Sequence, residues 1–206
     1  MFARSTTING DSGAMDAGIA YVRDQVMPML SDMPGCVGLS MMVDRESGRA
    51  IATTSWTSYD EMAASAANVS DARAKAAEIM GGTPVVDEWE IAVMHREHEA
   101  REGSCCRVTW VEMAPDGLDA MMDYYRSNVL TALEEMSGFC SASLLIDRAN
   151  GRGCSTARFD DRQAMIDSAP VARGLRETGA RDIGFKIIDV AEFELALAHL
   201  RVPEHV

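Results

Sequence analysis

Four side chains in the first half of the sequence have the chemistry to bind or transform a small molecule. Trp56 and Tyr59 flank the junction of a strand and a helix, where their rings could stack on a planar apolar ligand. Arg4 could hold a carboxylate or an enolate. His95 could serve as a general base near neutral pH. We therefore take Trp56 and Tyr59 as candidate substrate-binding residues, and His95 and Arg4 as candidate catalytic residues.

Each of these side chains also has a plainer interpretation. Packing in the hydrophobic core is the favoured role of Trp56, because a buried indole removes a large apolar area from water. Pairing with strand glutamates is favoured for Arg4, and a polar position at a strand end is favoured for His95. For Tyr59, exposure at the start of a helix and a place at the mouth of a cleft are equally well supported.

The cysteines give no sign of a metal or cofactor site. The sequence has five of them, an odd number without regular spacing, and no CxxC pair or Cys/His set typical of zinc is present. We predict no metal and no cofactor. Unpaired cysteines are typical of a reducing compartment, so we expect a cytoplasmic protein in which the adjacent Cys105 and Cys106 are free thiols.

The charge of the chain narrows the choice of partners. The net charge is −13, and both halves are acidic. An acidic surface repels phosphate backbones and anionic lipids, so we expect neither a nucleic acid nor a membrane as partner. The first ten residues lack the apolar segment of a signal peptide. The rings of Trp56 and Tyr59 suit a small apolar or aromatic molecule as partner instead.

The elements that position the candidate residues occur twice. The stretch Met33–Ser65 returns at Met136–Ser168, 103 residues later, with Gly, Ser, Asp-Arg and Gly-Arg in step. Each copy is typical of a strand, a hairpin loop, a second strand and the start of a helix. Gly48 and Gly151 end the loops, where glycine adopts a positive φ without strain.

Further strands and helices flank the repeated stretch. We predict a first strand at Phe2–Ile8 and a last strand at Val85–His95 in the first half. The helix after the first strand has an apolar stripe with the same spacing in both halves. The stripe consists of Met15, Ile19, Val22, Val26, Met29 and Met33 in the first half, and of Leu118, Met122, Tyr125, Val129, Ala132 and Met136 in the second.

Prolines are expected to interrupt two helices. Pro28 is predicted to kink or end the first helix, because an interior proline removes a hydrogen bond and costs ~3 kcal/mol. A second helix is predicted to run unbroken over Asp60–Met80. Its counterpart, Asp161–Glu177, contains Pro170 and Gly174, so we expect that helix to be broken or distorted.

Each half therefore has the order β-α-β-β-α-β of a ferredoxin-like domain. We predict a first domain at residues 1–95, a linker at 96–104 and a second domain at 105–206. Such a domain leaves one face of its sheet uncovered, so we expect an α+β fold in which the two domains pack sheet to sheet as a pseudo-dimeric barrel. The sequence leaves open whether the whole chain also forms a homo-oligomer.

The motifs of the first half resemble those of the antibiotic biosynthesis monooxygenase (ABM) domain. The resemblance is carried by Pro34-Gly35 after the first helix, by Ser55-Trp56 at a strand end, and by Tyr59-Asp60-Glu61 at a helix start. The second half keeps Gly138-Phe139 and has Phe159 in place of the Trp. The resemblance covers nearly the whole chain as two tandem domains, and it implies the dimeric α+β barrel fold.

The resemblance implies a function, but the catalytic residues known in the family are not present at the matching positions of this sequence. Quinone-forming members pair the Trp with an Asn and a Tyr, and Ala52 and Met62 stand at those places. Haem-degrading members use a helix His, and the sequence has no His before His95, so haem degradation is not expected. We expect a cofactor-independent monooxygenase-like protein that acts on or binds a small aromatic or quinol-like molecule. The alternative is a non-catalytic, ligand-binding or stress-associated protein.

The two halves are not expected to bind a ligand equally. Trp56 and Tyr59 open the second helix of the first half, whereas Phe159 and Arg162 stand at the matching places. An unbroken helix also makes a steadier wall than one that contains proline. We therefore expect any ligand site to belong mainly to the first half.

Overall fold

The structure, a computed structural model, describes residues 1–200 and 202–205. Its contacts divide the chain into two compact units. Unit 1 comprises Met1–Trp89 and Leu195–Val202, and unit 2 comprises Glu90–Glu194 and Pro203–Val206. The predicted boundaries at 95 and 105 follow the repeat in the sequence. The units divide between residues 89 and 90 and between residues 194 and 195.

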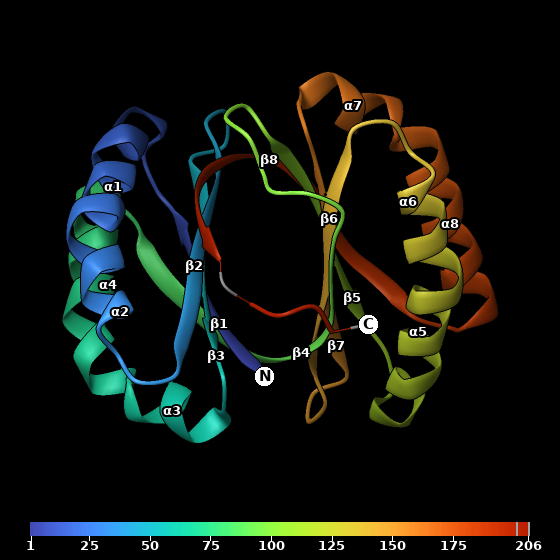
Figure 1. Cartoon of the computed structure of the whole chain (residues 1–206), viewed down its shortest axis with the longest axis horizontal. Coiled ribbons are helices and arrows are strands. Elements are labelled where there is room, and N and C mark those ends of the chain that lie inside the picture. Colours follow the sequence, from blue (N-terminus) through green and yellow to red (C-terminus); the bar gives the residue numbers. More distant parts are fainter. Residues whose placement is uncertain (201, 206) are drawn as a thin grey trace. The chain divides into compact units, whose positions relative to one another are not determined.

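Unit 1 contains the elements predicted for the first half. Figure 1 shows α1, α2 and α4 on one face of the sheet formed by β1, β2 and β3. The elements are β1 (Phe2–Asn9), α1 (Met15–Tyr21), α2 (Met27–Ser31), β2 (Cys36–Asp44), β3 (Arg49–Trp56), α3 (Tyr59–Ala64), α4 (Ala66–Met80) and β4 (Thr83–Arg96). A short 3-10 helix, Ser12–Ala14, leads into α1, and Val22–Val26 joins α1 to α2 as a π-helix.

Unit 2 repeats this order, with its own helices on one face of its own sheet (Figure 1). The elements are β5 (Cys105–Glu112), α5 (Leu118–Tyr124), α6 (Thr131–Glu134), β6 (Phe139–Asp147), β7 (Arg152–Phe159), α7 (Arg162–Asp167), α8 (Ala169–Asp182) and β8 (Lys186–Leu200). Here Pro115–Gly117 is the short 3-10 helix, and Tyr125–Leu130 is the π-helix. The predicted β-α-β-β-α-β order is therefore present twice.

The hydrogen-bonded strand order is β1-β3-β2-β8-β5-β7-β6-β4, and it closes on itself. The predicted α+β barrel class is confirmed. The register of the central hairpin is the same in both units, with Asp44 opposite Arg49 and Asp147 opposite Arg152. None of the helices in the described ranges is long and apolar enough to span a membrane.

The hairpin glycines are required by their backbone geometry. Gly48 has a φ of 72° and Gly151 a φ of 65°, in the left-handed region that other residues rarely adopt. A Cβ atom at Gly48 would also collide with the carbonyl oxygen of Gly10, and one at Gly151 with that of Met113. The prediction that these glycines shape the hairpin loops is confirmed.

The prediction that Pro28 interrupts the first helix needs correction. The irregularity is the π-helix Val22–Val26, and Pro28 lies after it in α2, within a run that stays helical from Met15 to Ser31. Unit 2 has the π-helix Tyr125–Leu130 at the equivalent place, although Thr131 stands where Pro28 does in unit 1. Proline is therefore not the cause of the wider helical turn.

The second helix is interrupted in both units, so the prediction of an unbroken Asp60–Met80 helix is wrong. The interruption lies at Ser65 in unit 1 and at Ser168 in unit 2. Each serine donates a hydrogen bond to the carbonyl three residues earlier and accepts one from a buried arginine. Pro170 begins α8, where proline is well tolerated, and Gly174 lies inside that helix without breaking it.

The five cysteines are free thiols. Cys106 and Cys140 are fully buried, and burial raises the pKa of both thiols. The prediction that Cys105 and Cys106 form no disulfide is confirmed. A raised pKa keeps a thiol protonated and weakly nucleophilic, so burial favours a packing role for these two side chains.

Candidate ligand sites between helices and sheet

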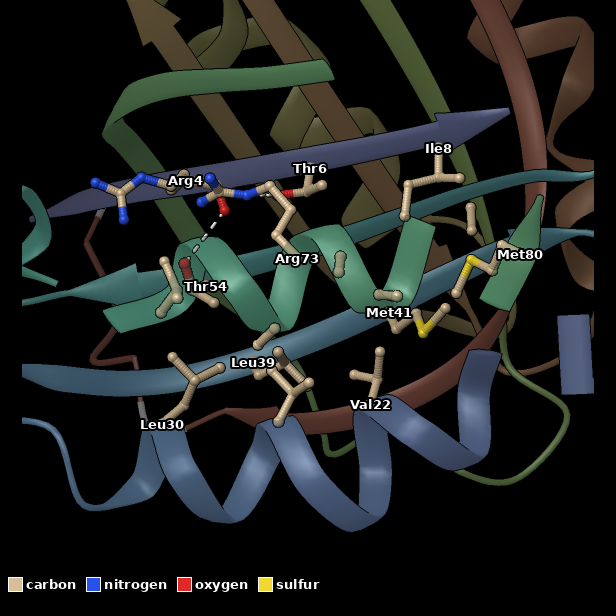
Figure 2. Close-up of a pocket in the computed structure, with 16 residues that line it drawn as sticks. Arg4, Thr6, Ile8, Val22, Leu30, Leu39, Met41, Thr54, Arg73 and Met80 are labelled. Carbon is tan, nitrogen blue, oxygen red and sulfur yellow. Dashed lines mark hydrogen bonds between the residues drawn. The ribbon is translucent and has the colours of Figure 1, made fainter. Parts of the chain in front are cut away.

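Unit 1 encloses a cavity of about 70 Å³ between its helices and its sheet. In Figure 2, Val22 and Leu30 from the helices face Leu39 and Met41 of β2, and Arg4 and Arg73 lie together near Thr54. The other lining residues are Thr6, Ile8, Val26, Ala50, Ala52, Val69, Ala72, Ala76 and Met80. The wall is thus almost entirely apolar, apart from two arginines and the threonines beside them.

Arg4 is held rigidly at one side of this cavity. Its side chain is 4% exposed and projects from β1. The guanidinium donates to the Glu88 carboxylate at 2.9 and 3.0 Å, to the Ser65 hydroxyl at 2.9 Å and to the Met62 carbonyl at 2.7 Å. The predicted pairing of Arg4 with a strand glutamate is confirmed, and the interruption between α3 and α4 supplies two of its acceptors.

Arg73 reaches the same cavity from α4 and is held much less firmly. Its Nε–H donates to the Thr6 hydroxyl at 3.3 Å. Burial and the neighbouring charge of Arg4 lower the pKa of the Arg73 guanidinium. Both effects penalise the charged form, so a negatively charged group bound beside Arg73 would relieve them.

Unit 2 encloses an equivalent cavity of about 90 Å³. Its lining residues are Arg107, Thr109, Val111, Met121, Tyr124, Tyr125, Val129, Leu133, Leu144, Ser155, Ala157, Ala172, Leu175, Arg176 and Phe185. Arg107 lies 103 residues after Arg4 and repeats its contacts, donating to Glu192 at 2.8 Å, to Ser168 at 2.6 Å and to the Met165 carbonyl at 2.7 Å.

Arg176 is the counterpart of Arg73 and has still fewer partners. It makes no hydrogen bond or ion pair with any residue that the structure describes. Its pKa is lowered by burial first, and then by the charges of Arg107 and Arg173. A half-buried guanidinium with free donors, aimed at an apolar cavity, is a ready partner for a carboxylate.

The π-helices form part of both cavity walls. Val22 and Val26 of the unit 1 segment line one cavity, and Tyr125 and Val129 of the unit 2 segment line the other. Such wider turns occur frequently at functional sites, because they displace the side chains that follow. Their position in both units supports the cavities as ligand sites.

Trp56 does not line the cavity of unit 1. Its side chain is 0% exposed and lies in the hydrophobic core, with Nε1 donating to the Thr54 hydroxyl at 3.0 Å. Tyr59 is 50% exposed and packs edge to face on Phe2. The structure therefore does not bring Trp56 and Tyr59 together at a cavity, and we place the candidate site at Arg4 and Arg73.

His95 lies in unit 2 among carboxylates. Its Nε2 is 2.9 Å from Glu97 and 3.2 Å from Glu134, and its Nδ1 is 3.8 Å from Glu204. The imidazole stacks on Phe139, and the donor atoms of His95, Glu97 and Glu134 lie within 4.8 Å of one another. His95 does not line either cavity, so the structure does not join it with Arg4 in one site.

The sequence contains a signal for the second arginine of each cavity. Arg73 and Arg176 are separated by the same 103 residues as the rest of the repeat. An arginine that recurs in step on a helix facing a sheet is a candidate for the cavity wall. Only the structure shows that both arginines are half-buried and that burial lowers the pKa of their guanidinium groups.

Relatives with nearly the same length exist in Mycobacterium tuberculosis. The chain is 52% identical over 206 residues to "Uncharacterized protein Rv2557" of strain H37Rv, covering 100% of this chain and 92% of that protein. It is 48% identical over 207 residues to "Uncharacterized protein Rv2558", covering 100% of this chain and 88% of that protein. No family model matches the chain.

Solved structures with the same fold include monooxygenase-like proteins. A candidate monooxygenase from Fusobacterium nucleatum has a TM-score of 0.72 at 14% identity, covering 97% of this chain and 94% of that one. A candidate monooxygenase from Lactobacillus acidophilus has a TM-score of 0.71 at 10% identity, with 97% and 96% covered. An anthrone oxidase-like protein has a TM-score of 0.67 at 10% identity, with 97% and 93% covered. These similarities establish the fold.

Proposed function

Because the chain belongs to the family of the Mycobacterium tuberculosis proteins Rv2557 and Rv2558 and shares the fold of monooxygenase-like proteins, we propose that it binds a small organic acid with an apolar body in its helix–sheet cavities. The observation that carries the proposal is a pair of arginines on the wall of an otherwise apolar cavity, present in each unit. The wall would hold the body of the ligand, and the arginines would hold its acidic group.

The balance of charge in unit 1 favours an anion. Arg4 and Arg73 bring two positive charges to the cavity, and Glu88 supplies the carboxylate that faces them. These three charges leave one positive charge in excess. The Arg73 Nε–H donates to the Thr6 hydroxyl, and the other N–H groups of this guanidinium, unpaired among the described residues, are free to donate to a ligand. A carboxylate or phenolate would supply the missing charge and accept those hydrogen bonds.

The charges around the unit 2 cavity also favour an anion. Two further arginines, Arg107 and Arg173, and two glutamates, Glu177 and Glu192, act on the charge of the Arg176 guanidinium. One positive charge is again in excess. Arg176 has no acceptor among the described residues, so the need for an anionic partner is greater here than in unit 1.

The small size of the cavities limits the ligand to a short chain or at most a single ring. A cavity needs roughly 10–15 Å³ of the same kind of volume to hold one water molecule. Volumes of about 70 and 90 Å³ are several times larger. Water in so apolar a space gains few hydrogen bonds, so an apolar ring would displace it favourably.

Benzoate tests the proposal, with the uncharged benzamide of similar shape as comparison. We expect isothermal titration of the full chain to give two benzoate sites and at least tenfold weaker binding of benzamide, because hydrogen bonds to charged groups contribute about 1.5–3 kcal/mol. Arg73→Met should remove the unit 1 site, and Arg176→Met should remove the unit 2 site. Each variant should leave one site intact.

Exposed cations on the same helices serve as controls. Lys75 on α4 and Arg181 on α8 are 51% and 70% exposed and pair with neighbours at the surface. Lys75→Met and Arg181→Met should keep both benzoate sites. The proposal is overturned if benzoate does not bind, if benzamide binds equally well, or if the control variants lose as much affinity as the cavity variants.

Cofactor-independent oxygenation of the bound molecule is the second candidate function. The fold of the monooxygenase-like structures supports it, and the paired arginines would favour the deprotonated, electron-rich form of a phenol or quinol. Such a substrate would take up one oxygen atom and would itself supply the two electrons that reduce the other atom to water.

Oxygen uptake separates catalysis from binding alone. With 1,4-naphthohydroquinone, a catalyst should consume oxygen faster than the protein-free solution, and the Arg73→Met/Arg176→Met double variant should lose at least nine-tenths of the excess rate. The Lys75→Met/Arg181→Met variant is the matched control. A rate equal to that of the protein-free solution would leave ligand binding as the function.

A further inference from the structure

Each of the two cavities has a pair of arginines at equivalent places, but the cavities differ in the polarity of one wall. Val22 and Ala52 line the unit 1 cavity, and Tyr125 and Ser155 stand at the equivalent places in unit 2. Both changes add a hydroxyl group. They also lie in contact with each other, because the Ser155 hydroxyl is 3.3 Å from the Tyr125 hydroxyl. The unit 2 wall has therefore acquired a connected pair of hydroxyl groups.

The hydroxyl pair is fixed in direction by its hydrogen bonds. Tyr125 is 5% exposed and donates to the Ser143 carbonyl at 3.2 Å, which leaves its oxygen to accept the hydrogen bond from Ser155. Burial raises the pKa of Tyr125 to about 12, so the phenol is protonated and remains a donor at neutral pH. Tyr125 thus holds the Ser155 hydroxyl in one orientation.

In that orientation the Ser155 oxygen can still accept a hydrogen bond. A serine hydroxyl has one donor and two acceptor lone pairs. The donor is used on Tyr125, and no donor to the Ser155 oxygen is found in residues 1–200 or 202–205. Ser155 lines the cavity, so a hydroxyl group on a bound ligand could donate to it.

At the place of Ser155 unit 1 has Ala52, whose side chain has no acceptor. The hydroxyl of unit 1 on this strand belongs to Thr54, two residues further along, and Ala157 replaces that threonine in unit 2. The Thr54 hydroxyl already accepts from the Trp56 indole at 3.0 Å and donates to the Arg4 carbonyl at 3.3 Å. A hydroxyl group on a ligand in unit 1 would therefore meet Val22 and Ala52 and lose its hydrogen bonds to water.

We infer that Ser155, oriented by Tyr125, makes the unit 2 cavity selective for ring acids that carry a hydroxyl group, whereas the unit 1 cavity prefers the same acids without one. The inference rests on the proposed function, because the acidic group is held by the arginines in both units. It assigns different ligands to the two cavities. Ser155 is the specificity-determining residue, and Tyr125 is the positioning residue.

The test compares benzoate with 3- and 4-hydroxybenzoate at one isolated cavity at a time. Arg73→Met leaves only the unit 2 site, and Arg176→Met leaves only the unit 1 site. At the unit 2 site we expect the better hydroxybenzoate to bind about three- to tenfold tighter than benzoate, the range for one added hydrogen bond. At the unit 1 site neither isomer should bind tighter than benzoate.

Variants of the hydroxyl pair complete the test. Ser155→Ala, in the Arg73→Met background, should abolish the preference, so that neither hydroxybenzoate binds tighter than benzoate does to the same variant. Tyr125→Phe keeps the ring and the cavity shape, and it should reduce the preference by releasing Ser155. If benzoate binds and neither isomer is preferred at the unit 2 site, or if Ser155→Ala keeps the preference, the inference fails and the proposed function stands. If benzoate binds neither site, the proposed function fails with it.

Discussion

Replacing Trp56 with alanine is expected to lower the free energy of unfolding by about 3–5 kcal/mol, the range for removing a large aromatic side chain from a core. The indole is 0% exposed and lies in the apolar cluster of unit 1 with Met62 and Leu39. Its loss would leave a void and would also leave the Thr54 hydroxyl without its donor. Urea unfolding followed by circular dichroism measures the change.

Ligand binding distinguishes this core role from the role of stacking on a ligand. Because Trp56 does not line the cavity, benzoate affinity of the folded Trp56→Ala protein should stay within about threefold of wild type. Phe159 occupies the matching place in unit 2 and is equally buried, so Phe159→Ala should destabilise the protein in the same range. A Trp56→Ala protein that unfolds like wild type but loses a benzoate site would show that the indole contacts the ligand.

Replacing Arg4 with methionine is expected to cost about 2–4 kcal/mol of unfolding free energy, somewhat below the range for breaking a fully buried ion pair. The change keeps most of the apolar stem and removes a guanidinium with partners on three segments. The Ser65 hydroxyl and the Met62 carbonyl would lose a buried donor, and Glu88 would lose its counter-charge. Glu88 is 39% exposed, so water can take over part of that loss.

Changing the other partner provides the comparison. Glu88→Gln keeps an acceptor for Arg4 at a half-exposed position, and it should cost about 1 kcal/mol or less, the scale for surface pairs. Arg107→Met in unit 2 should match Arg4→Met, because its partners Ser168, Met165 and Glu192 repeat those of Arg4. Equal effects of Arg4→Met and Glu88→Gln would show that the ion pair, rather than the acceptors between α3 and α4, fixes the arginine.

The sequence predicted the fold well, because its repeat allows each element to be tested twice. The hairpins around Gly48 and Gly151 and the shared helical stripe depend on short-range rules that leave a clear pattern. The pairing of Arg4 with a strand glutamate was also favoured from the sequence. It follows from the alternation of strand side chains, which puts Arg4 and Glu88 within reach once β1 and β4 are neighbours.

The site was predicted less well, because it depends on long-range packing. Trp56 is conspicuous in the sequence, but its environment decides whether it faces a ligand or the core. The Ser65 hydroxyl at the interruption accepts a hydrogen bond from Arg4, 61 residues away, a contact that no local propensity contains. The π-helices leave no proline or glycine signature, so the apolar stripe is read as an ordinary α-helix.

The paired π-helices also bear on the descent of the chain. A π turn corresponds to one residue inserted into an α-helix, and both units carry it at the same place although Pro28 and Thr131 now differ. Two identical insertions would be a coincidence if they had arisen separately, so the shared place of the π-helices favours a common origin of the two helices. The hydroxyl groups of Tyr125 and Ser155 occur in one unit, so the two cavities differ in their walls while the helical irregularity beside them is the same.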